Sequence, residues 1–158
     1  METAVLTSAF LAGVAAGGRS MTPIATIALT TRPNTASMWL DRAASNPGRV
    51  LLTAGAAAEL VGDKLPNTPS RLMAQGLGIR IATGALGGAA LAWRTRGNPA
   101  LGALCGGVGA VAGSYAGAYW RRWAGTEQVT AFVAAVAEDL LTAATAVAAA
   151  ALAPQTRT

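Results

Sequence analysis

The chain has 158 residues, of which 53% are hydrophobic and only 12% are charged. A soluble domain usually carries about 25% charged residues, so this composition excludes an ordinary water-soluble fold and predicts an integral membrane protein. The absence of histidine excludes histidine-based catalysis, and the single cysteine, Cys105, excludes an intrachain disulfide. The net charge of +5 comes from basic residues spread between apolar segments, which is typical of membrane-flanking residues and indicates no nucleic-acid partner.

The first apolar segment covers residues 4–31 and is interrupted near its middle. Residues 17–23 read GGRSMTP, which places two glycines, a charge and a proline where a membrane helix would continue. Proline lacks an N–H and disfavours helix at the residue before it. The sequence therefore predicts two half-helices, over residues 4–16 and 23–31.

Polar turns separate the remaining segments. Residues 32–48 are polar, and a short interfacial helix is expected over 36–44. The continuous apolar runs show no alternation, so they predict helices rather than strands. These helices are expected over residues 50–65, 72–93, 100–120 and 129–153. The predicted fold class is all-α, a compact bundle of about five hydrophobic helices in a single domain over residues 1–158.

Glycines recur at intervals of four in three of these segments. The series are Gly13 and Gly17, Gly84 and Gly88, Gly102 and Gly106, and Gly109, Gly113 and Gly117. This spacing places the glycines on one helix face, where a second backbone can approach closely. Because these faces exceed what one small bundle needs, we expect a homodimer or a larger homo-oligomer.

Weak sequence matches link the first segment to the fourth and the second to the fifth. They indicate a possible inverted repeat, in which the matched segments run in opposite directions across the membrane.

Seven charged side chains fall within or at the edge of the apolar segments. They are Arg19, Glu59, Asp63, Lys64, Arg80, Glu138 and Asp139. A charge at the centre of a membrane helix costs about 2.5–3.5 kcal/mol, so these groups need compensation. One interpretation is a set of structural salt bridges, and the other is a polar site or pathway at the midplane. In both, we expect at least two of the four acids to meet Arg19, Lys64 or Arg80.

The break in the first segment adds a candidate binding site. A half-helix that begins near Pro23 presents free N–H groups beside Ser20 and Thr22, with Arg19 adjacent. Many secondary transporters bind their substrates at such discontinuous helices, and a helix N-terminus attracts anions. The alternative is a kinked helix that binds no ligand.

Residues 59–71 read ELVGDKLPNTPSR and are followed by Arg80 and the glycines of residues 84–88. This pattern resembles a family of small bacterial membrane proteins catalogued as a domain of unknown function (the DUF four-one-two-six type). The interruption over residues 17–23 and the acidic pair Glu138 and Asp139 also resemble that family. The resemblance implies a multi-pass protein of the bacterial inner membrane and implies no activity.

Two classes of function remain open from the sequence. The first is a small transporter or channel for an ion or metabolite, with a site built from the broken helix and the buried acids. The second is a structural or assembly subunit that packs through its glycine faces. We expect the lipid bilayer as a partner, and neither enzymatic activity, nor a catalytic residue, nor a cofactor, nor a bound metal ion.

Overall fold

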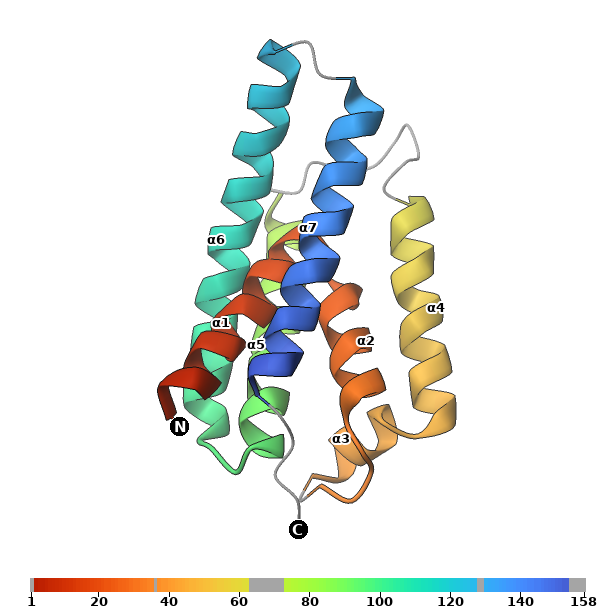
Figure 1. The fold of residues 1–158 in the computed structure, drawn as a ribbon, viewed down its shortest axis with the longest axis vertical. Helices are drawn as coiled ribbons and strands as arrows, with labels where there is room; N and C mark the ends of the chain where they lie inside the picture. The colour runs from red at the N-terminus through yellow and green to blue at the C-terminus, as the bar shows by residue number, and fades with distance from the viewer. Residues whose placement is uncertain (1, 36, 63–72, 128–129, 154–158) are drawn as a thin grey trace.

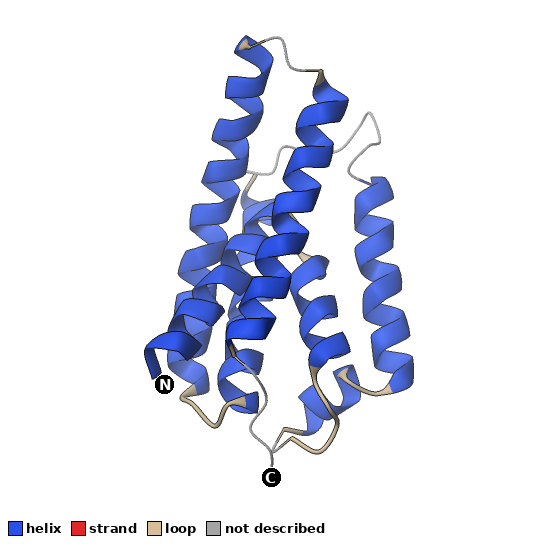
Figure 2. Ribbon diagram, in the orientation of Figure 1, coloured by secondary structure: helices blue, strands red, loops and turns tan. Residues whose placement is uncertain are grey.

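The computed structural model describes residues 2–35, 37–62, 73–127 and 130–153 (Figure 1). These residues form seven α-helices, and the described ranges contain no strand (Figure 2). The all-α prediction is confirmed for this part of the chain. In chain order the helices are α1 (Glu2–Gly18), α2 (Met21–Thr30), α3 (Met38–Ala43), α4 (Asn46–Gly62), α5 (Ala74–Arg94), α6 (Pro99–Thr126) and α7 (Ala131–Leu152).

Two of the described helices, α6 and α7, are long and apolar enough to cross a membrane. With 28 and 22 residues, they are about 42 and 33 Å long at 1.5 Å per residue. Asn98 begins α6 by accepting hydrogen bonds from the backbone N–H groups of Ala100 (2.9 Å) and Leu101 (3.3 Å), and Pro99 occupies its first turn. The helix continues to Thr126, beyond the predicted end at residue 120.

The first two helices form a hairpin that turns back inside the bundle (Figure 1). At its start, α1 lies beside the connection between α5 and α6, where a Cβ on Gly97 would be 3.4 Å from Val5 Cγ1. At its end, α2 reaches the same end of the bundle, where Arg94 Nη1 donates to Thr30 Oγ1 (3.0 Å). The hairpin therefore enters and leaves at one end.

The tip of this hairpin lies halfway along α6 and α7. A Cβ on Gly17 would be 2.5 Å from the backbone nitrogen of Ser114, near the middle of α6. A Cβ on Gly18 would overlap the side chain of Thr142, near the middle of α7. Only residues without a side chain allow the chain to turn this close to both helices.

The predicted break is present, but its geometry corrects two expectations. The helices on either side of the break are antiparallel, so they are not two halves of one membrane span. The second helix begins at Met21 rather than Pro23, which lies in the first turn of α2, where its missing N–H is tolerated. As a consequence, α1 begins and α7 ends at the same end of the bundle (Figure 1).

Glycines bring α6 into close contact with both α1 and α5. Gly13 packs on Gly106, and Gly17 packs further along α6, so α1 and α6 are parallel. Gly84 packs on Gly106 and Gly88 on Gly102, so α5 and α6 are antiparallel. The parallel course of α1 and α6 contradicts the expected inverted repeat, which needs the first and fourth segments to be opposed.

The glycine faces of α6 meet helices of the same chain. Gly109 faces the carbonyl oxygen of Phe10, and Gly113 faces the backbone of Val14, in each case too closely for a side chain. Gly117 is half-buried and lines a cavity beside α7. These faces therefore give no argument for a homo-oligomer, which stays a prediction.

The short helix α3 packs on the core instead of lying free at the surface. Leu40 is 1% exposed and belongs to the same buried cluster as Leu91 and Ile27. The ring of Trp39 meets that of Trp93 edge to face, with 5.5 Å between their centroids. Of its three large apolar residues Met38, Trp39 and Leu40, Met38 alone is exposed, as an interfacial helix would require.

A carboxylate holds the loop that leads into α3. Asp41 Oδ1 accepts hydrogen bonds from the backbone N–H groups of Asn34 (3.0 Å) and Thr35 (2.7 Å) and from the Thr35 hydroxyl (2.7 Å). Partial desolvation acts to raise the pKa of Asp41, but these hydrogen bonds outweigh it and hold the pKa below its ordinary value of 3.8.

We expect this contribution to be pH-dependent. Because the folded pKa of Asp41 is below its unfolded value, the stabilisation is present above pH 3.8 and is lost as the pH falls through the folded pKa. Asp41→Asn should lower the melting temperature at pH 7, and the difference from wild type should shrink as the pH falls below 3.8. A difference that is constant across this range, measured by thermal unfolding, would contradict the assignment.

Candidate functional site

Five of the seven charged residues singled out in the sequence lie in the described ranges, and these five gather around the tip of the α1–α2 hairpin. Here α1 ends with unpaired carbonyl groups and α2 begins with unpaired N–H groups, so the two helix ends present opposite partial charges. The tip lies inside the bundle, where these groups need partners. Side chains from α4 and α5 supply them, and a side chain from α7 pairs with Arg19 in the turn.

Arg80 of α5 satisfies the end of α1. Its Nη1 donates to the carbonyl oxygens of Gly17 (2.5 Å) and Gly18 (2.8 Å), and the residue is 6% exposed. A cation at a helix C-terminus is stabilised by the partial negative charge of the last carbonyls. Arg80 is therefore a structural cap for the hairpin in this conformation.

Glu59 of α4 satisfies the start of α2. Its Oε1 accepts from the backbone N–H of Ser20 (2.7 Å) and its Oε2 from that of Met21 (2.8 Å). The backbone N–H groups at the predicted anion site are thus bonded to the protein's own carboxylate, and binding of another anion there stays a prediction. Ser20 contributes its N–H and makes no side-chain cap bond, and Thr22 is half-buried in the first turn, with its carbonyl bonded to Thr26 Oγ1 (2.9 Å).

Arg19 connects the turn to α7. Its Nε and Nη2 both donate to Asp139 Oδ1, at 2.9 and 2.5 Å, and its Nη1 donates to the backbone carbonyl of Glu59 at 3.3 Å. The Arg19 side chain is 3% exposed and that of Asp139 is 21% exposed. Of the acid–base pairs expected from the sequence, the structure thus contains Arg19–Asp139, formed between residues 120 positions apart.

Glu138, the neighbour of Asp139, faces a different helix. Its Oε2 accepts from Arg121 Nε of α6 at 3.0 Å. The carboxylate is buried, whereas the side chain of Arg121 is 44% exposed. The sequence did not indicate this pair, because Arg121 stands between Trp120 and Trp123 and was interpreted as a membrane-flanking residue beyond the end of its helix.

A cavity of about 330 Å³ lies beside this ion pair, between α1, α6 and α7. Its walls are mostly small or apolar, and Glu138, Thr142 and Thr145 add polar groups. Gly18, at the tip of the hairpin, also lines it. The cavity therefore reaches from the tip of the hairpin to Glu138.

The sequence did not identify two arginines, one buried and one half-buried, as partners of helix ends. Arg94, 3% exposed, donates to the carbonyl oxygens of Ala153 (2.8 Å) and Ala150 at the end of α7. Arg49 donates to those of Ala28 (3.1 Å) and Thr31 (2.7 Å) at the end of α2. Like Arg80, both place a positive charge at the C-terminus of a helix, where it is stabilised by the last carbonyl groups. In the sequence they lie next to polar turns, which is why they were interpreted as membrane-flanking residues.

Two further residues predicted at the site, Asp63 and Lys64, lie outside the described residues. Within the described ranges, no group of three or more aspartate, glutamate, cysteine or histidine side chains could hold a metal ion. The arrangement offers paired carboxylates and guanidinium groups, which bind ions, protons or small charged solutes.

Comparison of the chain with protein-family models, curated proteins and solved structures finds no significant match. The resemblance to a family of bacterial membrane proteins therefore stays a prediction, and the function has to be inferred from the geometry.

Proposed function

We propose that the protein is a small multi-pass membrane transporter or channel for an ion or small metabolite. Its site is the charge cluster at the hairpin tip, with Arg19, Glu59 and Asp139 at the centre and Glu138 beside the cavity. The observation that carries the proposal is the re-entrant hairpin, which brings two helix ends and several ionisable groups halfway along α6 and α7.

A membrane location is supported by the surface as well as by the two long helices. Large apolar side chains point outward on several helices, including Leu51 of α4 (72% exposed), Leu104 of α6 (66%) and Phe132 of α7 (71%). Extended apolar surfaces of this kind are rare on soluble monomers and mark contacts with lipid or protein. We place the chain in the bacterial inner membrane, with α6 and α7 as full spans.

Transport is supported by the kind of residues at the centre. Ionisable side chains inside a membrane bundle usually line a substrate or ion route, and irregular backbone at that depth is tolerated where protein or water satisfies it. The hydrogen bonds of Glu59 at the start of α2 suggest a simple mechanism, in which a transported anion takes the place of the Glu59 carboxylate. Displacement of this carboxylate frees two N–H groups for another anion.

The distribution of basic residues supports one orientation. At the end where α1 begins and α7 ends, the described helices and loops hold Arg32, Arg42, Arg49, Arg94 and Arg96, whereas the described residues of the opposite end hold Arg121 and Arg122. Lys64 and Arg71 lie outside the described residues. Cytoplasmic loops carry the excess of basic residues, so we assign the end where α1 begins and α7 ends to the cytoplasm.

A static scaffold is the second candidate, and one observation favours it. Arg19, Glu59, Arg80 and Glu138 each have a partner in the same chain, as expected of a matched structural network. The two candidates differ in what a charge-neutralising substitution changes, which is stability for a scaffold and flux for a transporter.

Flux in proteoliposomes tests the proposal. Vesicles that contain a dye sensitive to the ion under test receive a gradient of protons, Na⁺, K⁺ or Cl⁻ in turn, or of acetate with a pH-sensitive dye, and we expect at least one to dissipate faster than in empty vesicles. Glu138→Gln should reduce that flux at least tenfold and leave the fold intact. The matched control, Glu127→Gln, changes an exposed glutamate at the end of α6 and should have no effect. Equal rates in protein-containing and empty vesicles for all five ions would contradict transport of ions of this size.

A further inference from the structure

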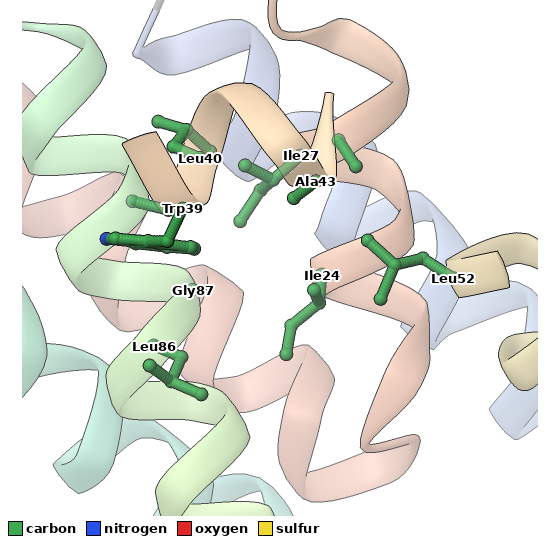
Figure 3. Close-up of a pocket in the computed structure, with 10 residues that line it drawn as sticks. Ile24, Ile27, Trp39, Leu40, Ala43, Leu52, Leu86 and Gly87 are labelled. Carbon is green, nitrogen blue, oxygen red and sulfur yellow. The ribbon is translucent and has the colours of Figure 1, made fainter. Parts of the chain in front are cut away.

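A second cavity, separate from the charge cluster, lies between α2, α3, α4 and α5 (Figure 3). Its volume is about 240 Å³, and none of the residues that line it is polar. The lining includes Ile24 and Ile27 of α2, Trp39 and Ala43 of α3, Leu52 of α4 and Leu86 of α5.

The cavity is open toward the outside of the bundle. Leu86 is 51% exposed, and Trp39 and Leu52 are partly exposed. Gly87 lies between Leu86 and Trp39 in the wall and leaves room there, since a Cβ at this position would be no closer than 3.4 Å to Ile27 Cδ1. An apolar cavity excludes water and accepts apolar guests, and in a membrane the guest at hand is a lipid chain.

The end of the cavity formed by α3 is positively charged. Arg42 is exposed on α3, next to Ala43, which lines the cavity, and Arg49 lies one turn before Leu52 on α4. Arg32 is exposed in the loop that leads into α3. Asp41 offsets one of these three positive charges, and its carboxylate accepts hydrogen bonds from its own loop. Arginine is well suited to bind phosphate, because its planar group donates two parallel hydrogen bonds.

We propose that this cavity binds one acyl chain of an anionic phospholipid, whose headgroup phosphate is bound by Arg42. The apolar lining selects the chain, and the excess of arginine over aspartate selects a negatively charged headgroup over a zwitterionic one. This site rests on the membrane location under the proposed function and is independent of transport.

Mass spectrometry of the intact protein in mild detergent tests the binding. With phosphatidylglycerol and phosphatidylcholine added in equal amounts, we expect at least fivefold more of the former to bind. Ala43→Phe fills the cavity and should lower this binding at least tenfold, as should Leu86→Trp at the half-exposed position. The control Ala57→Phe makes the same change on the exposed face of α4 and should bind as wild type does. Arg42→Ala should remove the preference between the two lipids.

A second readout does not depend on the filling variants. Phosphatidylglycerol with brominated acyl chains should quench the tryptophan emission of the wild type, and Trp39→Phe should remove most of this quenching. Equal binding of the two lipids by the wild type, unchanged binding by both filling variants, or unchanged quenching in Trp39→Phe would each overturn the lipid site. A protein that alkaline carbonate removes from membranes would instead overturn the proposed membrane function.

Discussion

Replacing Gly113 with leucine is expected to unfold the protein rather than to weaken an oligomer. A Cβ at this position would overlap the carbonyl oxygen of Val14 and lie 2.9 Å from its carbonyl carbon and its Cα. These are backbone atoms, so α1 would have to move away from α6 and withdraw the hairpin from the centre. Overpacking costs about 1–3 kcal/mol and occasionally more, and we expect about 3 kcal/mol or more here.

Thermal unfolding in detergent, followed by circular dichroism, measures this effect. Gly125→Leu is the matched control, because it lies on the same helix and a Cβ there meets no atom within 4 Å. We expect the control to melt near the wild-type temperature. A folded Gly113→Leu monomer of wild-type stability would show that α1 does not pack on α6 as described.

Replacing Arg19 with methionine is expected to have the second largest effect. The substitution keeps much of the side-chain volume and leaves Asp139 without its two hydrogen bonds from the guanidinium group. Removing one partner of a buried ion pair typically costs 3–5 kcal/mol, and we expect about 3 kcal/mol because Asp139 is 21% exposed.

The double variant Arg19→Met/Asp139→Leu separates stability from function. Replacing both charges removes the uncompensated carboxylate, so at least half of the lost stability should return. A transport site should remain inactive in this variant, because its charges are gone. Restored stability together with wild-type ion flux would show that the pair is structural only.

The sequence predicts the local features of the hairpin and not its course. The glycines and the proline of residues 17–23 identify the break, because each of them weakens a helix by itself, and the charge of Arg19 is costly at the centre of a membrane span. Hydropathy is the same for two half-helices in line and for two that fold back on each other. The antiparallel arrangement depends on contacts with α6 and α7, which are distant in the sequence.

The partners of the charged residues were harder to predict than their positions. Depth in an apolar segment indicates that Arg19, Glu59 and Glu138 need compensation, but many pairings satisfy that need. Glu59 is matched by backbone N–H groups, which no pattern of charges shows. Arg121 became available to Glu138 because α6 continues beyond its predicted end, and helix ends are the least certain part of such predictions.

The accessibility of single cysteines tests the re-entrant hairpin most directly. In a Cys105→Ser background, cysteine is placed at the start of the hairpin at Thr3, after it at Pro33, or at Gly125 near the opposite end of the bundle, all of which are exposed. A membrane-impermeant maleimide is then added to one side of sealed, oriented vesicles. We predict that Thr3→Cys and Pro33→Cys react from the same side and Gly125→Cys from the other. Reaction of Thr3→Cys and Pro33→Cys from opposite sides would show that the first segment crosses the membrane and would contradict a site at the hairpin tip.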